Sequence, residues 1–347
     1  MRAIAIEKPN QMTLVDVPKP TIGPYDALVK TEVNFICNAT DRKLVDGHFP
    51  GIGPEGYPML VGHENSGIVE EVGAKAASFK PGDRVIGGLI WELDAPYKFG
   101  WGGASDYVVA RDHLAMVAGG VADEAHGWSD LYQIMKKVPR DIQPDAAGLL
   151  CTWREVYAAF TDFNLKPEYR ILVFGAGPVG LSFIAFAKNK GFTFVACVEP
   201  QRDKHALAKR LGADAVYVPD QDFVREFEKD AGEKADAVID AVGNTAITNA
   251  SLPLLKLGAS MCVYGVIADA AMVVDKGKGP LNFNLLVHQW PTRTLEAAAQ
   301  EPLIEWIRTG KLKAEDFVTG RFPVADFEKA FAASRAPGAI KTMIVFN

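Results

Sequence analysis

The sequence predicts an α/β protein in which a β-rich first part is followed by a doubly wound parallel sheet. Two observations support this prediction. Up to about Arg111, short runs with strand character are separated by glycine and proline turns. From about Asp145 onward, strand patterns alternate with helical patterns, which is typical of a parallel sheet covered by helices.

The first part contains short strand candidates at close spacing, which favours a β-barrel-like or sandwich domain. They span 1–7, 12–17, 27–35, 67–72, 84–87 and 105–110. The segment 116–135 fits no strand, and we expect a loop with a short helix there.

In the second part, glycines end several helical patterns. The predicted helices span 203–211, 222–231, 246–257 (ended by Gly258) and 302–309, and a last one opens within 322–331. The predicted strands span 171–174, 192–198, 215–218, 235–242, 260–266 and 341–346.

The clearest functional motif is Gly175-Ala-Gly177-Pro178-Val179-Gly180, which joins the strand at 171–174 to an apolar helical pattern. Gly175 allows a tight turn, Gly177 lets the backbone approach a pyrophosphate, and Gly180 lets the helix pack closely on the strand. The free N–H groups of the helix N-terminus would face the phosphates. The motif therefore predicts a dinucleotide site, with a glycine turn in another α/β unit as the alternative.

The strand at 192–198 ends at Glu199, where an acidic side chain would accept the ribose hydroxyls of NAD. A carboxylate there would repel the additional phosphate of NADP, so we expect NAD. Arg202 and Lys204 follow closely, and a basic pair is the feature that would accept that phosphate.

The composition excludes several classes of protein. The 347 residues are 48% hydrophobic and 23% charged, which is ordinary for a globular protein. A net charge of −6 argues against nucleic acid or an anionic membrane as the main partner. No apolar run reaches membrane-spanning length, and the first residues alternate like a strand and lack the long apolar region of a signal peptide, so we expect a cytoplasmic protein. Its four cysteines are then metal ligands or buried thiols and not disulfides.

Three separated elements form a candidate metal site. Cys37 ends a predicted strand, His63 and Glu64 follow a proline-rich loop, and Cys151 lies just before the α/β part. Zinc prefers thiolate, imidazole and carboxylate ligands, and a catalytic zinc keeps an open position. Spacing alone leaves the alternative open that the cysteines are buried apolar residues and that His63 and Glu64 form a polar turn.

Taken together, these motifs resemble the zinc-dependent medium-chain dehydrogenase/reductase superfamily, which includes the alcohol and polyol dehydrogenases. The resemblance covers nearly the whole chain and rests on the stretches 62–73, 79–85, 175–180, 208–214 and 321–331. It implies a GroES-like catalytic domain at 1–150, completed by 290–347, and a Rossmann NAD-binding domain at 151–289. Zinc would lie in the cleft between the two domains.

The resemblance also implies roles for individual residues. Cys37, His63 and Cys151 correspond to the first, second and third zinc ligands, and Glu64 to a nearby carboxylate that reaches the metal in some members. Polyol dehydrogenases often use a glutamate in the third-ligand region, so Glu155 is a competitor of Cys151.

The proton-relay region departs from the usual family pattern, because the run from Cys37 to Asp41 has one residue more. Thr40 resembles the residue whose hydroxyl takes the substrate proton. In the alternative alignment Ala39 occupies this position, and the proton relay differs. Lys43 stands where some alcohol dehydrogenases have a relay histidine, and His48 is a possible substitute.

Other positions follow from the same resemblance. Gly243 and Val266 would border the nicotinamide. The interval 87–103 lacks the cysteines of a structural zinc lobe, so we expect one catalytic zinc per chain and no structural zinc. Two alternatives stay open for four further residues, which would form either a substrate pocket or an ordinary packed surface: Trp91, Glu92, Tyr97 and Trp128.

The sequence thus predicts reversible hydride transfer between NAD(H) and an alcohol, for which a polyol, sugar or cyclitol secondary hydroxyl is the leading substrate. A simple aliphatic or aromatic alcohol is the alternative within this class, and a zinc-free quinone or enoyl reductase of the same superfamily is the alternative outside it. A homodimer or homotetramer is expected.

Overall fold

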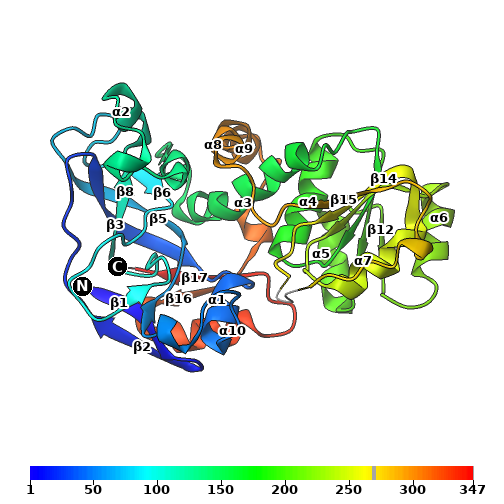
Figure 1. The fold of residues 1–347 in the computed structure, drawn as a ribbon, viewed down its shortest axis with the longest axis horizontal. Coiled ribbons are helices and arrows are strands. Elements are labelled where there is room, and N and C mark those ends of the chain that lie inside the picture. Colours follow the sequence, from blue (N-terminus) through cyan, green and yellow to red (C-terminus); the bar gives the residue numbers. More distant parts are fainter. Residues whose placement is uncertain (268–270, 347) are drawn as a thin grey trace. The chain divides into compact units, whose positions relative to one another are not determined.

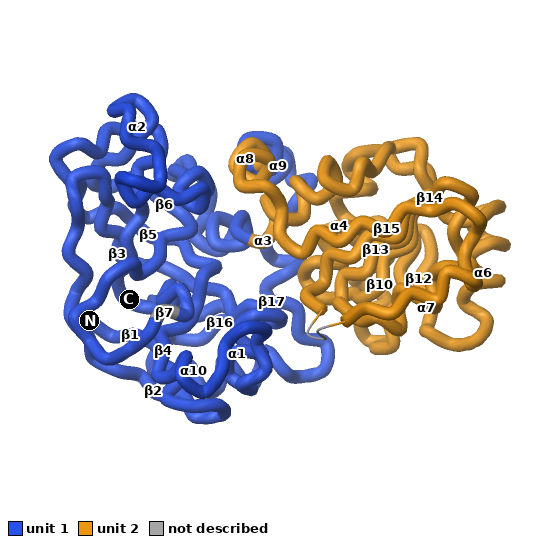
Figure 2. Tube along the Cα trace, in the orientation of Figure 1, with its two compact units in different colours: residues 1–151, 300–347 blue, residues 152–299 orange. Residues whose placement is uncertain are grey.

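The computed structural model describes residues 1–267 and 271–346 (Figure 1). The chain separates into two compact units (Figure 2), Met1–Cys151 with Gln300–Asn347 and Thr152–Ala299. The sequence-based domains had their boundaries at 150 and 290, and as functional domains they stay a prediction. The predicted fold class, a β-rich GroES-like part with a parallel Rossmann sheet, is confirmed.

The first unit is built on two sheets. The larger has the order β16-β17-β3-β5-β6-β9, with β8 also paired to β3, and the smaller has the order β2-β1-β4-β7. Their strands are β1 (Arg2–Lys8), β2 (Gln11–Asp16), β3 (Asp26–Phe35), β4 (Met59–Leu60), β5 (Glu64–Val72), β6 (Arg84–Ile86), β7 (Lys98–Phe99), β8 (Tyr107–Arg111), β9 (Lys137–Val138), β16 (Val318–Pro323) and β17 (Lys341–Val345). Each of the predicted strands in the first part has a counterpart among them.

Short helices complete this unit: α1 (Thr40–Asp46), α2 (His113–Ala118), α9 (Gln300–Arg308) and α10 (Phe327–Ser334). The segment 116–135 holds the end of α2 and two short 3-10 turns, close to the loop with a short helix that was predicted. The last helix begins within 322–331, as predicted. Phe322 and Pro323 pair with β17, and α10 starts only at Phe327.

The second unit contains a parallel sheet with the order β12-β11-β10-β13-β14-β15 in the described residues. Its strands are β10 (Arg170–Phe174), β11 (Phe194–Val198), β12 (Ala215–Tyr217), β13 (Ala235–Asp240), β14 (Leu255–Val263) and β15 (Asn284–Val287), and its helices α4 (Pro178–Asn189), α5 (His205–Arg210), α6 (Phe223–Ala231), α7 (Thr245–Ser251) and α8 (Arg293–Ala298). Helix α4 packs on β10 and β11, and α7 packs on β13 and β14.

The predicted helix at 246–257 was too long. Helix α7 ends at Ser251, because Pro253 cannot continue it, and Leu255 already begins β14. Gly258 does not end a helix. It lies inside β14 with a φ of 81°, where the register against β13 shifts.

The sequence analysis missed α3 (Pro144–Asp162), a 19-residue helix that continues from the first unit into the second. The region around Cys151 had been treated as a short approach to the α/β part. Among the residues that the structure describes, no helix is long and apolar enough to cross a membrane.

Candidate active site

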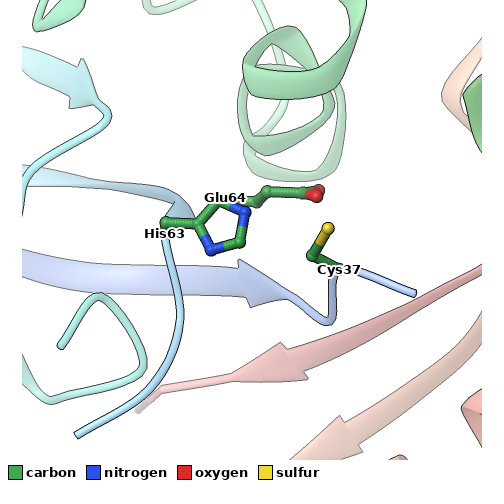
Figure 3. A group of neighbouring side chains, drawn as sticks. All are labelled: Cys37, His63 and Glu64. Atoms are coloured by element: carbon green, nitrogen blue, oxygen red, sulfur yellow. The ribbon is translucent and has the colours of Figure 1, made fainter. Parts of the chain in front are cut away.

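Three predicted site residues meet in the first unit. The ligand atoms of Cys37, His63 and Glu64 all lie within 4.8 Å of one another (Figure 3). Strands β3 and β5 are antiparallel with Phe35 opposite Glu64, so the end of one strand meets the start of the other. This register is why residues distant in the sequence converge here. A thiol, an imidazole and a carboxylate form a donor set that suits zinc.

A glycine positions the turn that carries His63. Gly62 has a φ of 93°, and a Cβ there would lie 2.5 Å from the backbone nitrogen of Ala104. The turn therefore needs glycine both for its conformation and for the close approach of the neighbouring backbone. The His63 ring then lies against Trp101, with the ring centroids 5.2 Å apart.

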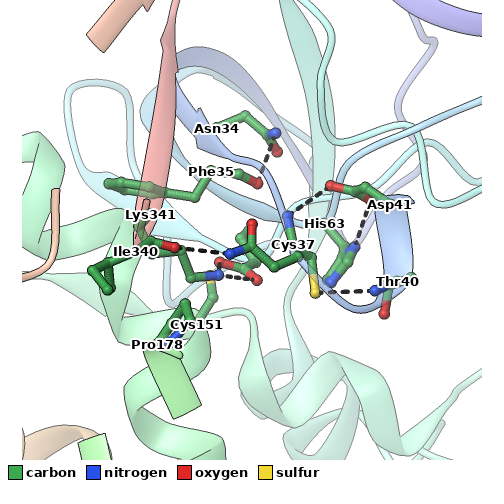
Figure 4. Close-up of polar contacts among 12 residues, drawn as sticks. Asn34, Phe35, Cys37, Thr40, Asp41, His63, Cys151, Pro178, Ile340 and Lys341 are labelled. Atoms are coloured by element: carbon green, nitrogen blue, oxygen red, sulfur yellow. Dashed lines mark hydrogen bonds and ion pairs between the residues drawn. The ribbon is translucent and has the colours of Figure 1, made fainter. Parts of the chain in front are cut away.

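Asp41 organises two of the three residues from α1 (Figure 4). Its Oδ2 accepts a hydrogen bond from the backbone N–H of Cys37 at 2.9 Å, and its Oδ1 lies 3.6 Å from His63 Nδ1. Burial lowers the pKa of His63, but the Asp41 carboxylate and the Cys37 thiol outweigh burial and raise the pKa well above its usual value. Negative charge thus dominates the surroundings of this imidazole, as a cation site requires.

Glu64 is held by a buried cation that the sequence analysis missed. Lys341 Nζ donates to Glu64 Oε1 at 2.6 Å and also contacts Oε2, and both side chains are almost fully buried. Burial lowers the pKa of Lys341, but the charges of Glu64 and Cys37 raise it above its usual value. The carboxylate that would approach a metal is therefore shared with an ammonium group.

Cys151 lies outside the group of three in the described structure. It is buried in α3, and its thiol faces the backbone oxygen of Asn65 with the sulfur 3.7 Å away. Because Asn65 follows Glu64, the thiol lies next to the strand that carries the cluster. Its competitor Glu155 accepts a hydrogen bond from the indole N–H of Trp290 at 3.1 Å.

The relay candidates lie on and after α1. Thr40 opens the helix, and its backbone N–H donates to Cys37 Sγ at 3.4 Å (Figure 4). Ala39 and His48 are exposed, and His48 follows the glycine that ends α1. Burial lowers the pKa of Lys43, and this effect outweighs the attraction of the nearby Cys37 thiol, which acts to raise that pKa.

The second unit carries the glycine loop at the end of β10. Gly175 has a φ of 94°, and Gly177 precedes α4, whose first residue is Pro178. A Cβ on Gly180 would lie 1.8 Å from the carbonyl oxygen of Gly175, so no larger residue fits there. Among the described residues, no atom other than those of its chain neighbours lies within 4 Å of a Cβ added to Gly177, which leaves this part of the backbone open to a ligand. Val179 follows in the first turn of α4.

Glu199 follows β11 and is only 4% exposed. Its two carboxylate oxygens accept hydrogen bonds from the backbone N–H groups of Ala176, at 2.6 Å, and Gln201, at 2.8 Å. The acidic side chain is thereby tied directly to the glycine loop. Arg202 opens the short helical turn that follows.

The two residues predicted beside the nicotinamide also come together. A Cβ on Gly243 would lie 2.6 Å from the carbonyl oxygen of Val266, so the loops after β13 and β14 touch through their backbones. Asp240, which the sequence analysis missed, accepts hydrogen bonds from the backbone N–H groups of residues 242–244. Burial raises the pKa of Asp240 in spite of these N–H groups.

Comparisons with known proteins give the family. Residues 23–119 match the alcohol dehydrogenase GroES-like domain, and residues 178–287 match the zinc-binding dehydrogenase family. The chain is 26% identical to the probable D-xylulose reductase A of Aspergillus clavatus, with 99% of this chain and 96% of that protein covered.

Solved structures share the fold. An alcohol dehydrogenase from E. coli CFT073 in complex with NADH superposes with a TM-score of 0.80 at 21% identity, covering 100% of this chain and 99% of the other. A zinc-binding dehydrogenase from Sinorhizobium meliloti 1021 bound to NADP has a TM-score of 0.78 at 21% identity, with 99% and 98% covered.

The chain belongs to the zinc-dependent medium-chain dehydrogenase/reductase superfamily, and within it to the alcohol and polyol dehydrogenase type of oxidoreductase. This confirms the resemblance stated from the sequence.

Proposed function

We propose that the protein transfers a hydride reversibly between NAD(H) and the secondary hydroxyl of a polyol, sugar or cyclitol. One observation carries the proposal: Cys37, His63 and Glu64 converge at one point of a chain that also carries a complete glycine loop. D-xylulose reductase and D-arabitol-phosphate dehydrogenase among the relatives favour a polyol over a simple aliphatic or aromatic alcohol, which stays the alternative.

In this proposal Cys37, His63 and Cys151 hold one zinc ion, with Glu64 as a nearby carboxylate. When bound, zinc supplies Lewis-acid chemistry that lowers the pKa of the substrate hydroxyl. Asp41 orients Cys37 and His63 as metal ligands through its contacts to the Cys37 backbone N–H and the His63 ring. Lys341 balances the charge of Glu64, so that the carboxylate stays ionised in a buried place.

Thr40 takes the proton of the substrate hydroxyl. Its backbone N–H contact to Cys37 keeps the first turn of α1 beside the cluster. From Thr40 the proton passes toward solvent, through the exposed His48 or through the cofactor ribose. Lys43, half-buried near Cys37, adds positive charge along the same helix.

NAD binds at the glycine loop, where Gly177 and the start of α4 offer free backbone N–H groups to the pyrophosphate. Glu199 accepts the ribose hydroxyls and disfavours NADP, although Arg202 and Lys204 are close in sequence. Gly243 and Val266 border the nicotinamide, on loops that Asp240 holds in place.

We further propose a homo-oligomer. Strand β15 lies at the edge of the parallel sheet, and Leu281, Leu285 and Val287 are exposed on and before it. An exposed apolar strand at a sheet edge is a surface that a second copy can cover.

The four free cysteines agree with the reducing, cytoplasmic compartment predicted from the sequence.

The test is reduction of NAD⁺ and NADP⁺ by a panel of polyols, sugars, cyclitols and simple alcohols. The zinc-loaded protein is compared with the same protein after a chelator has removed its metal. We expect NAD⁺ to be preferred, a polyol or sugar to be the best donor, and activity to return when zinc is added back. Reduction of quinones or enones by NADPH, unaffected by the chelator, would instead assign the protein to the zinc-free reductases.

A further inference from the structure

A polar cavity lies in the first unit, away from the proposed metal site. It has a volume of about 250 Å³, and its lining includes Thr21, Asp26, Trp91, Glu92 and Arg111. Pockets for drug-sized ligands usually measure about 300–1,000 Å³, so this cavity suits a smaller molecule.

The topology separates the cavity from the metal site. Asp26 is the first residue of β3 and pairs with Arg111, the last residue of β8, whereas Cys37 follows the other end of β3. A strand of ten residues extends roughly 30 Å. Strand β17, which carries Lys341, pairs only with the Cys37 end of β3. The two sites therefore occupy opposite ends of one strand.

Arg111 presents hydrogen-bond donors in a fixed position. Its guanidinium carbon lies 5.2 Å from the ring centroids of both Trp91 and Tyr132, and Nη1 donates to the Tyr132 hydroxyl at 2.8 Å. Nε is buried without a hydrogen bond among the described residues, and its ion-pair distance to Asp26 is 3.4 Å. Within the same residues, Nη2 has no hydrogen-bond partner.

The cavity also offers hydrogen-bond acceptors. In the part of the chain that the structure describes, the exposed Glu92 carboxylate and the Thr21 hydroxyl make no hydrogen bond or ion pair. The indole N–H of Trp91 donates to the backbone oxygen of Val109 at 3.2 Å, which fixes the aromatic ring in the wall. The cavity thus combines an exposed acceptor, the Glu92 carboxylate, with the Nη2 donor of Arg111 and the fixed ring of Trp91.

We propose that this cavity binds a small neutral polyhydroxylated molecule, a polyol or a sugar, at a site separate from the metal centre. Hydroxyl groups both donate and accept, so they can pair with Glu92 and with Arg111 at once. The two carboxylates and one guanidinium leave a net negative charge, which disfavours an anion. The tryptophan contributes the aromatic surface that sugar rings pack against.

Ligand-observed NMR titration of the full-length protein tests this proposal, with D-arabitol as the neutral probe and sodium acetate as the anionic probe. D-arabitol is expected to bind saturably and with the same affinity in Cys37→Ala, which removes a proposed metal ligand. Glu92→Gln should raise its Kd about tenfold, because the charge-assisted hydrogen bond is replaced by a weaker neutral one. Glu328→Gln, another exposed carboxylate of this unit, is the matched control and should have no effect.

Arg111→Met should weaken binding as well, but it also removes the contact to Tyr132, so Glu92→Gln is the decisive variant if Arg111→Met does not fold. The proposal is overturned if neither probe saturates, if acetate binds more tightly than D-arabitol, or if Glu92→Gln binds like wild type. Loss of binding in Cys37→Ala would place the polyol at the metal site. Activity toward alcohols can fail independently of all these results.

Discussion

Glu64 in the first unit and two carboxylates beside the glycine loop in the second, Glu199 and Asp240, are stabilised in different ways. In the first unit, Glu64 is paired with the buried cation of Lys341. In the second unit, Glu199 and Asp240 accept hydrogen bonds from backbone N–H groups of the loops beside them. The Glu64–Lys341 ion pair joins two strands that are distant in the sequence. The hydrogen bonds to Glu199 and Asp240 instead hold the backbone of the adjacent loops in one conformation.

The difference indicates what each arrangement serves. A metal site needs side chains whose total charge is controlled, and a lysine next to the carboxylate provides that control. A nucleotide site needs backbone held in one shape, and a carboxylate that accepts several N–H groups holds it. Variants at Lys341 should therefore affect stability most, and variants in the loops that Glu199 and Asp240 hold should affect cofactor binding most.

The largest expected effect is that of Lys341→Met in the metal-free protein. It leaves the Glu64 carboxylate buried without its cation, so we expect a loss of about 3–5 kcal/mol in the free energy of unfolding. The double variant Lys341→Met with Glu64→Gln should lose less than the single one. Lys329→Met breaks an exposed pair with Asp326 and should leave the free energy of unfolding nearly unchanged in the same denaturant titration, because solvent screens this pair. Equal losses in the buried and exposed pairs would contradict the comparison.

Two glycines of the loop provide the next test. Gly180→Ala places a Cβ against the carbonyl of Gly175, so it should lower the melting temperature and weaken NADH binding at least about 30-fold, or 2 kcal/mol. Gly177→Ala meets no neighbouring atom within 4 Å, so stability should be unchanged while NADH binding still weakens. Thermal unfolding and NADH fluorescence titration separate the two outcomes. Wild-type NADH affinity in Gly177→Ala would mean that the pyrophosphate does not approach there.

A smaller change is expected in cofactor preference. Glu199→Ala removes the carboxylate that repels the additional phosphate of NADP, so the ratio of kcat/KM for NADP⁺ over NAD⁺ should rise about tenfold, or 1.4 kcal/mol. Adding Arg202→Ala should reverse part of that gain if Arg202 receives the phosphate. An unchanged ratio in Glu199→Ala would show that the carboxylate serves only the backbone of Ala176 and Gln201.

The smallest effect concerns Asp162, for which the attraction of His288 and the backbone N–H of Thr292 do not offset the effect of burial. Its Oδ2 is buried without a hydrogen bond in the described residues, and burial raises the pKa of Asp162. A raised carboxyl pKa means that the folded state binds the proton more tightly, so stability falls as pH rises through that pKa. The side chain is partly exposed, so Asp162→Asn should add less than about 1 kcal/mol at pH 7 and nothing at about pH 3. A loss of stability at pH 7 would contradict this account.

The sequence predicted the features that depend on neighbouring residues. The glycine loop, the strand before it and the acidic residue at the end of β11 are local in sequence, and the structure has them where they were expected. Cys37, His63 and Glu64 were found through family motifs, and the pairing of β3 with β5 explains why they meet.

Other parts gave no local signal. Lys341 lies 277 positions from Glu64, so nothing in either segment indicates that the two form a pair. Helix α3 was missed because the apolar run around Cys151 does not by itself distinguish a helix from a strand. The start of β14 was taken for the end of a helix, because Gly258 resembles a helix stop, while Pro253 and the buried leucines next to it decide the conformation.

The most direct test of the central claim is the zinc content of the purified protein by elemental analysis. Wild type is compared with Cys37→Ala and with Cys197→Ala, a cysteine buried in β11. The account predicts about one zinc per chain in wild type and in Cys197→Ala. It predicts no zinc in Cys37→Ala, with alcohol-dependent NAD⁺ reduction lost in the same variant. Zinc retained in Cys37→Ala, or no zinc in wild type, would contradict a metal centre built on Cys37 and His63.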